Sequence, residues 1–249
     1  MLRFITALVL LLIPSWAWAA ITFDAASSAE GTTSTSHSHT IASDANIVVI
    51  CVVMRDGGGA VEAITTAPTV GGQNASLVTG AVRTLTANNS RRVEMWYKLA
   101  PPTGSQTIAV TSPAVTDQTL TGVLSYKSVA QSSTWGTASV AEGGSNSDID
   151  LFNIVSAVNE MGVMCGATQN AGTPATFTAD ANTPVSTERL DVAHSTGSTM
   201  SLGMYEETGT ASNFDMRMNS SITSNWIAVA SSMKPLAATT RASSSITIE

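Results

Sequence analysis

The chain of 249 residues is poor in charge: charged residues make up 12% of it, and acidic residues outnumber basic ones by 18 to 11. A net negative surface repels phosphate groups, so the composition argues against a nucleic-acid partner. The length is sufficient to bury a full hydrophobic core as a single domain.

Residues 1–20 are predicted to be a secretory signal peptide. Arg3 provides a positive charge, residues 4–13 form an apolar stretch, and Ala17-Trp18-Ala19 matches a small-x-small cleavage motif. The stretch is about ten residues long, whereas a membrane span needs about 20. We therefore expect a secreted, periplasmic or cell-surface protein that has no membrane contact after signal removal. An uncleaved membrane anchor is the alternative.

Beyond the signal, turn-forming residues recur about every eight to fifteen positions, and helical periodicity is nearly absent. This spacing is typical of an all-β sandwich or barrel. Gly71 and Gly72 can supply the positive φ of a tight hairpin. The predicted strands lie at residues 21–24, 35–42, 46–54, 75–86, 91–99, 105–111, 118–128, 135–141, 147–152, 158–167, 174–178, 184–192, 199–206, 212–219 and 224–234.

The predicted strand at 46–54 is apolar at eight successive positions, from Ile47 to Met54. A strand has this pattern when both of its faces are covered. We therefore expect either long loops of the same chain or another subunit to lie over its outer face.

The predicted strand at 91–99 alternates instead, as a half-buried strand does. One face is expected to meet the core and carries Val93, Met95, Tyr97 and Leu99. The other face is expected to meet water and carries Arg92, Glu94, Trp96 and Lys98.

The second half of the chain echoes the first. Cys51 and Cys165 lie in similar apolar runs 114 residues apart, Tyr97 and Tyr205 are 108 apart, and Lys127 and Lys234 are 107 apart. A duplicated unit with small loop deletions leaves such near-constant spacing. We predict pseudo-symmetric halves at 21–130 and 131–235 that form one all-β, two-sheet antiparallel sandwich of the jelly-roll type. Two separate small sandwiches are the alternative.

The two cysteines invite a disulfide, because the periplasm and the cell exterior are oxidising. Cys51 and Cys165 would occupy equivalent strands of the two halves, so they could meet near a pseudo-twofold axis. Equally, each could be a buried free thiol in its own strand, since free cysteine is among the most buried residue types. The sequence leaves both arrangements open.

The tail at 236–249 follows the last predicted strand and begins as a linker. It ends in Ser245-Ile246-Thr247-Ile248, whose alternation suits a strand added to an exposed sheet edge. The tail is expected to be a frayed terminus, and a segment that joins one subunit to the next is the alternative.

The segments Arg91–Thr111 and Asn225–Pro235 carry strand and turn patterns that resemble a group of uncharacterised β-sandwich domains. These jelly-roll-like domains occur in bacterial extracellular proteins and in virion-associated proteins of phages and prophages. The resemblance covers roughly residues 21–235. It implies the fold, and it implies no catalytic residues.

Few side chains are candidates for chemistry. Trp96, if it faces outward, and Trp135 could stack on a sugar ring or anchor a partner, although a core position is the default for tryptophan. His37 and His39 share one face of a strand and could form a zinc site with His194. A polar edge strand explains these histidines better, since no other ligand supports the site.

The carboxylates form no recognisable set. Asp180, Asn182, Glu206 and Glu207 lie in loop-like or strand-end positions, and calcium is the one cofactor that they leave open, although a regular twelve-residue calcium loop is missing. Glu94, Asp148 and Asp150 lack the strand pattern of laminarinase-like enzymes and are expected to face solvent. No Gly-x-Ser-x-Gly motif of a serine hydrolase occurs.

We therefore expect a secreted, non-enzymatic structural or surface-interaction protein, a subunit of an extracellular or virion assembly, whose partners are other protein subunits or a surface glycan. The alternative is a lectin-like carbohydrate-binding module that uses Trp96 or Trp135, and a sandwich-fold glycoside hydrolase comes third. Specific activity is expected where the halves differ: in the Gly57–Gly59 loop, the 131–146 crossover and the C-terminal tail.

Overall fold

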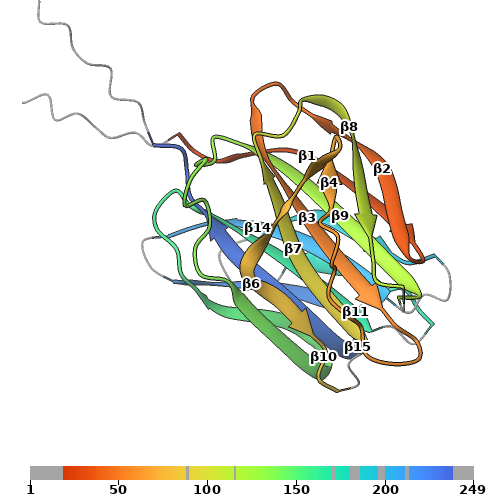
Figure 1. Ribbon diagram of the computed structural model, residues 1–249. Helices are drawn as coiled ribbons and strands as arrows, with labels where there is room; N and C mark the ends of the chain where they lie inside the picture. Colours follow the sequence, from red (N-terminus) through yellow and green to blue (C-terminus); the bar gives the residue numbers. More distant parts are fainter. Residues whose placement is uncertain are drawn as a thin grey trace, which may run out of the picture.

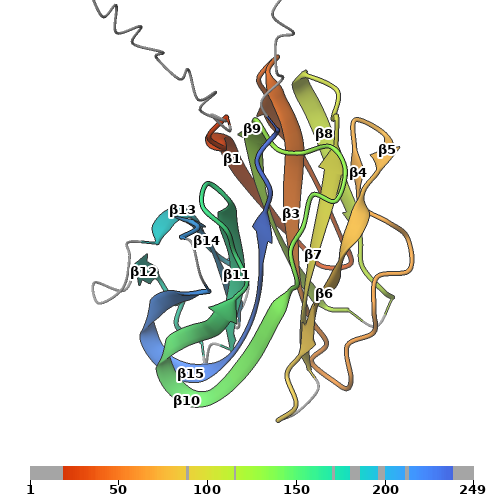
Figure 2. The same ribbon diagram turned by 90° about the vertical axis from the view of Figure 1, so that its left-hand side faces the viewer.

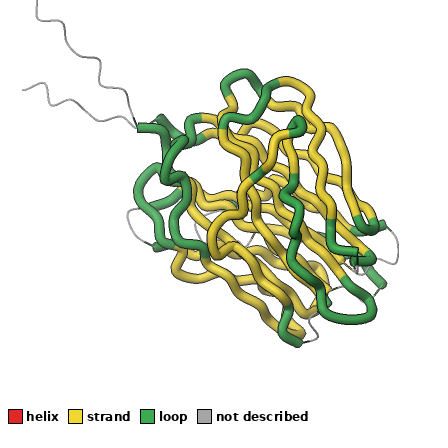
Figure 3. The backbone as a smooth tube through the Cα atoms, viewed as in Figure 1, coloured by secondary structure: helices red, strands yellow, loops and turns green. Residues whose placement is uncertain are grey.

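The computed structural model describes residues 19–87, 90–114, 116–169, 172–179, 186–195, 200–210 and 213–237. Most of the predicted signal peptide and of the tail therefore lies outside the described residues. Strands and loops alone make up the described chain (Figure 3). In this part of the protein no helix is long and apolar enough to cross a membrane. The expected all-β fold is confirmed.

Fifteen strands are present in the described residues (Figure 1). Two pairs of predicted strands turn out to be single long strands, β10 and β15. The bounds are β1 Thr22–Gly31, β2 Ser34–Ile41, β3 Ala45–Arg55, β4 Thr69–Val70, β5 Gln73–Asn74, β6 Ser76–Thr84, β7 Arg91–Leu99, β8 Gly104–Thr111, β9 Gln118–Lys127, β10 Ser139–Ile154, β11 Met161–Gln169, β12 Phe177–Ala179, β13 Thr187–Ala193, β14 Met200–Thr208 and β15 Phe214–Met233.

The strands form three antiparallel sheets packed in layers (Figure 2). The outer sheet has the order β2-β8-β4-β5, the middle sheet β1-β9-β3-β7-β6, and the curled sheet β10-β15-β11-β14-β13, with β12 added beside β15. The sandwich architecture is confirmed, and the expected count of two sheets is corrected to three. The extra sheet exists because the middle sheet is apolar on both faces and must be covered twice.

Strand β3 shows this double burial directly. Val48, Ile50 and Val52 pack in the core between the middle and outer sheets. Val49 and Cys51 pack in the core between the middle and curled sheets. The cover predicted for this strand is therefore supplied by the same chain, by the outer and curled sheets and by Val61 and Ile64 of the loop between β3 and β4.

The same cover corrects the prediction for β7. Its supposed water-facing side lies under the outer sheet, so Glu94 is only 1% exposed and Trp96 only 8%. Glu94 accepts hydrogen bonds from Trp96 Nε1 at 3.0 Å and from the backbone N of Ile64 at 3.2 Å. It also pairs with Arg92 Nε at 2.6 Å. Alternation identified two faces correctly but could not show that both are buried.

The duplication is visible in the strand order. The middle sheet runs β1-β9-β3-β7-β6 and the curled sheet runs β10-β15-β11-β14-β13, so each strand of the middle sheet has a counterpart in the curled sheet, whereas the outer sheet β2-β8-β4-β5 has no matching sheet in the described residues of the second half. Cys51 pairs with Met95 and Gly122, and Cys165 pairs with Met204 and Val229. The similarity predicted from sequence spacing is therefore seen in one sheet of each half, and the bounds of the halves stay a prediction.

Each half also encloses a core of its own. In the first half, β1-β9-β3-β7 faces β2-β8-β4-β5, which is a jelly-roll arrangement of strands. In the second half, β10 and β15 stay paired while the sheet bends back on itself, with register shifts between Gly143 and Asp148 (Figure 2). Phe177, Phe214 and Met218 fill the space inside the bend. Two small sandwiches thus pack back to back through a third, shared core.

One expected equivalence is off by a single residue. Tyr205 directly follows Met204 and is the counterpart of Trp96, whereas Tyr97 lies one position further along β7. Because side chains alternate, a slip of one residue moves a side chain to the opposite face. Tyr97 therefore packs against the shared core, and Tyr205 belongs to the core of the second half.

A disulfide joins the halves across the shared core. Cys51 and Cys165 are bonded, their Cα atoms are 6.1 Å apart, and both residues are 0% exposed. Of the two arrangements that the sequence leaves open, the structure has the bond. It links equivalent strands, β3 and β11, at the centre of the layers.

Candidate functional site

A groove lies at the seam between the halves, along the crossover that connects β9 to β10. It consists of two adjoining hollows of about 680 and 390 Å³ that share Thr79, Trp135 and Gly136. We call it the seam groove. The larger hollow is also lined by Gly80, Thr137, Ala138, Val155, Ser156, Ala157, Glu160 and Lys234, and the smaller one by Tyr97, Leu99, Gln131, Ser132, Ser133 and Thr134.

The crossover is held in place by the end of β15. Trp135 forms an isolated bridge with Met233, and the backbone N of Gly136 donates to Ser232 O at 2.8 Å. Lys234 N donates to Thr134 O at 2.8 Å. These backbone bonds make the crossover an ordered wall of the groove, because a segment paired to a buried strand cannot move independently.

Trp135 is the central side chain of the groove. It is half-buried and meets the ring of Tyr97 edge to face, with the ring centres 5.6 Å apart. Among the described residues, no acceptor lies within hydrogen-bond distance of its buried Nε1 atom. Buried polar atoms normally have a partner, so this indole N–H is an unsatisfied donor beside the groove.

The rim of the larger hollow is apolar and exposed. Val155 is 52% exposed, and Val158, in the same loop between β10 and β11, is 58% exposed. Leu236, just beyond the last strand, is 43% exposed. Glu160 and Lys234 add one acidic and one basic group beside these side chains. The groove therefore offers both apolar area and hydrogen-bonding groups.

The structure separates the two predicted tryptophans. Trp135 lines the seam groove, whereas Trp96 is enclosed between the middle and outer sheets and has no surface for stacking. Trp96 is therefore corrected from a candidate binding residue to a core residue. The sequence located the 131–146 crossover, but it gave no signal for Thr79, Glu160 or Lys234, which reach the groove from distant strands and loops.

The histidines form a polar chain inside the first half. His39 Nδ1 lies 2.7 Å from Ser27 Oγ, and His39 Nε2 lies 3.1 Å from Ser125 Oγ. Ser125 Oγ in turn donates to Asp24 Oδ2 at 2.7 Å. Burial, with a smaller contribution from His37, lowers the pKa of His39 to about 4. These contacts stabilise the interior with neutral imidazoles.

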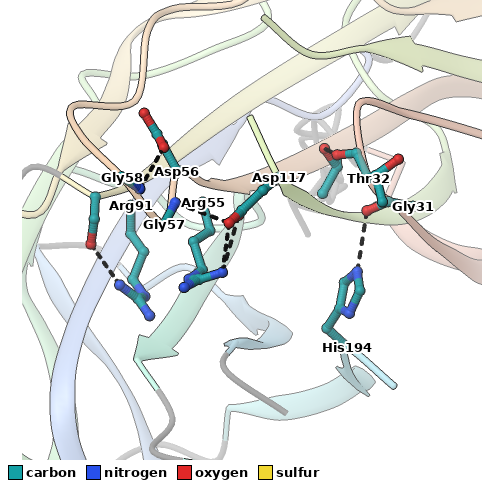
Figure 4. Close-up of polar contacts among 11 residues, drawn as sticks. Gly31, Thr32, Arg55, Asp56, Gly57, Gly58, Arg91, Asp117 and His194 are labelled. Atoms are coloured by element: carbon teal, nitrogen blue, oxygen red, sulfur yellow. Dashed lines mark hydrogen bonds and ion pairs between the residues drawn. The ribbon is translucent and has the colours of Figure 1, made fainter. Parts of the chain in front are cut away.

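His194 lies apart from that chain. Its Nε2 atom contacts the backbone oxygen of Gly31 at 3.1 Å (Figure 4), and its Nδ1 atom lies 3.8 Å from Glu30 Oε2. Across the residues that the structure describes, no group of three or more His, Cys, Asp or Glu side chains could hold a metal ion. The three histidines are therefore not brought together.

The predicted carboxylates are scattered. Asp148 and Asp150 lie on β10, and Asp150 contacts Arg217 at 3.7 Å. Glu206 is paired with Arg189, and Glu207 accepts a hydrogen bond from Ser186 Oγ at 2.9 Å. Burial raises the pKa of Glu207 to about 7.

The remaining loop residues, Asp180 and Asn182, lie outside the described residues. The calcium expectation that rested partly on them stays a prediction.

Comparisons with protein-family models, with curated proteins and with solved structures find no match to this chain. The resemblance to virion-associated and extracellular sandwich domains stays a prediction. The geometry of the sheets and the seam groove is therefore the basis for any functional conclusion.

Proposed function

We propose that this protein is a secreted, non-enzymatic surface-interaction module, a subunit of an extracellular or virion assembly, and that the seam groove is its contact site. The observation that carries the proposal is the exposed apolar rim at Val155 and Val158, which adjoins an ordered groove. Exposed apolar groups next to polar ones are typical of protein contact surfaces.

The scaffold suits this role. Three cores and a central disulfide fix the two halves relative to each other, so the walls of the groove are held by elements that do not depend on a partner. A contact surface that is already ordered loses little conformational entropy on binding. The protein would act by presenting a fixed surface.

The test is assembly of the mature protein and of two variants. Val158→Asp places a charge on the groove rim and should lower the sedimentation coefficient reached at high concentration, or remove the protein from particles purified from its source. Phe152→Asp is the matched control, since Phe152 is 49% exposed and does not line the groove. The proposal fails if wild type sediments as a monomer throughout and is missing from source particles.

A second candidate function is carbohydrate binding at the same groove. It is favoured by Trp135, whose half-buried ring lies in a hollow lined by hydroxyl groups and can stack on a sugar ring. A glycan array should then show reproducible binding that is lost in Trp135→Ala and kept in Phe152→Ala. Binding that survives Trp135→Ala would exclude the groove as the sugar site.

A further inference from the structure

A second pocket lies at the opposite end of β7 from the seam groove. Leu99 ends β7 at the groove and Arg91 begins it at this pocket, so the two sites are eight residues apart, or about 27 Å along a strand. The pocket has a volume of about 350 Å³. It is lined by Arg55, Asp56, Gly57, Gly58, Gly59, Ser90, Arg91 and Gln169.

Two arginines face each other in this pocket. Arg55 and Arg91 are direct partners in the β3–β7 pair, and their side chains extend side by side in Figure 4. Like charges directly opposite each other on neighbouring strands destabilise a sheet. The sequence gave no sign of this pairing, because it depends on the register between β3 and β7.

The charged side chain of Arg91 is buried, which is energetically unfavourable. It is only 6% exposed and contacts Ser90 Oγ at 2.6 Å. Burial, and then the charge of Arg55, lowers the pKa of Arg91 to about 10. The guanidinium therefore remains a cation at neutral pH, and it lines the pocket together with that of Arg55.

Asp117 acts on both arginines, and its charge opposes the lowering of the pKa of Arg91. Asp117 accepts two bonds from Arg55 NH1, at 2.9 and 3.1 Å, and one from the backbone N of Gly57 at 3.0 Å. Asp56 Oδ1 accepts a hydrogen bond from the backbone N of Gly58 at 2.8 Å. Arg55 Nε is buried and has no acceptor in the described part of the chain. Asp117 thus orients the Arg55 side chain through its NH1 nitrogen.

We propose that this pocket binds an oxyanion, the carboxylate or sulfate group of an extracellular ligand, between the guanidinium groups of Arg55 and Arg91. Planar guanidinium groups bind carboxylate and sulfate oxygens through paired hydrogen bonds. An anion there relieves the repulsion between the two arginines. The site is separate from the seam groove and does not depend on the function proposed for it.

The glycine loop keeps the pocket accessible. A Cβ atom on Gly58 would lie 3.7 Å from its nearest neighbour, Asp56 Oδ1, so the position has room for a side chain. A Cβ on Gly57 would come within 2.5 Å of Asp117 Oδ2, so that position does not. Gly58 is exposed and lines the pocket, which makes it the best place to block the site without disturbing the arginines.

Thermal unfolding of the mature protein in sodium sulfate, sodium glucuronate and sodium chloride at equal ionic strength tests the proposal. An anion at about five times its dissociation constant should raise Tm by about 2–4 °C over chloride. The rise should persist in Gly58→Asn and vanish in Gly58→Asp, which has the same size but adds a carboxylate. Arg91→Gln should also lose it, and the Gly58 pair keeps the test valid if Arg91→Gln does not fold.

The two anions identify the ligand chemistry. A rise with glucuronate alone assigns a carboxylate, and a rise with sulfate alone assigns a sulfate group. Sulfate also stabilises proteins generally by exclusion from their surface. An equal rise in wild type, Gly58→Asn and Gly58→Asp is that general effect, and it overturns the proposal, as does no rise with either anion.

Discussion

Breaking the disulfide between Cys51 and Cys165 should cost a large part of the stability of the protein. The bond closes a loop of 114 residues through the core shared by the two halves. In the chain-entropy description, a cross-link stabilises by restricting the unfolded state, and a loop of this length corresponds to about 5 kcal/mol at 25 °C. Measured values for disulfides are typically about 2–4 kcal/mol, so we expect a loss in that range or slightly above it.

The assay is urea unfolding of the same chain in two redox states. The bond is fully buried, so the protein is reduced in denaturant, refolded with reductant present and compared with the oxidised form. Both thiols should stay in the shared core as small apolar groups, so the comparison adds almost no change in packing. The unfolding slope m should also be steeper after reduction, because the unfolded chain then exposes more surface.

Two results would refute this reasoning. If mass spectrometry of the unreduced native protein finds two thiols that can be alkylated, the bond does not form. If the oxidised and reduced forms differ by less than about 0.5 kcal/mol, the loop-closure account is wrong for this chain.

Two further predictions concern the interior. His39 has a pKa of about 4 in the fold and an ordinary value of 6.5 when unfolded, so its contribution of about 3 kcal/mol is present above pH 6.5 and is lost as the pH falls to 4. His39→Gln should shrink the stability difference between pH 7 and pH 4, and an unchanged difference in urea titrations would contradict this. Gly122→Ala places a Cβ 2.6 Å from Leu190 and Met204 and should cost about 1–3 kcal/mol, whereas Gly58→Ala should cost almost nothing.

Much of the fold could be predicted because it depends on local patterns. Strand positions follow from alternation and from turn residues; Gly71 and Gly72, for example, do adopt the positive φ values of 55° and 77° expected in a tight hairpin. The unbroken apolar run from Ile47 to Met54 correctly indicated a strand covered on both faces. The similar apolar runs around Cys51 and Cys165 correctly indicated equivalent strands, β3 and β11.

The errors come from contacts between distant parts of the chain. Trp96 has the same alternating pattern whether water or the outer sheet covers its face, so the sequence could not distinguish a binding residue from a core residue. The facing pair of Arg55 and Arg91 depends on the register between β3 and β7, which composition does not reveal. The seam groove was found only through Trp135, because its other walls come from separate elements.

The position of the disulfide has a consequence for how the halves associate. Cys51 and Cys165 occupy equivalent strands and are bonded to each other. In a symmetric dimer, a residue on the twofold axis contacts its own copy in the same way. Two separate chains would form such an interface only above a threshold concentration. Here the crossover keeps each half at a high effective concentration for the other, so dilution cannot separate them.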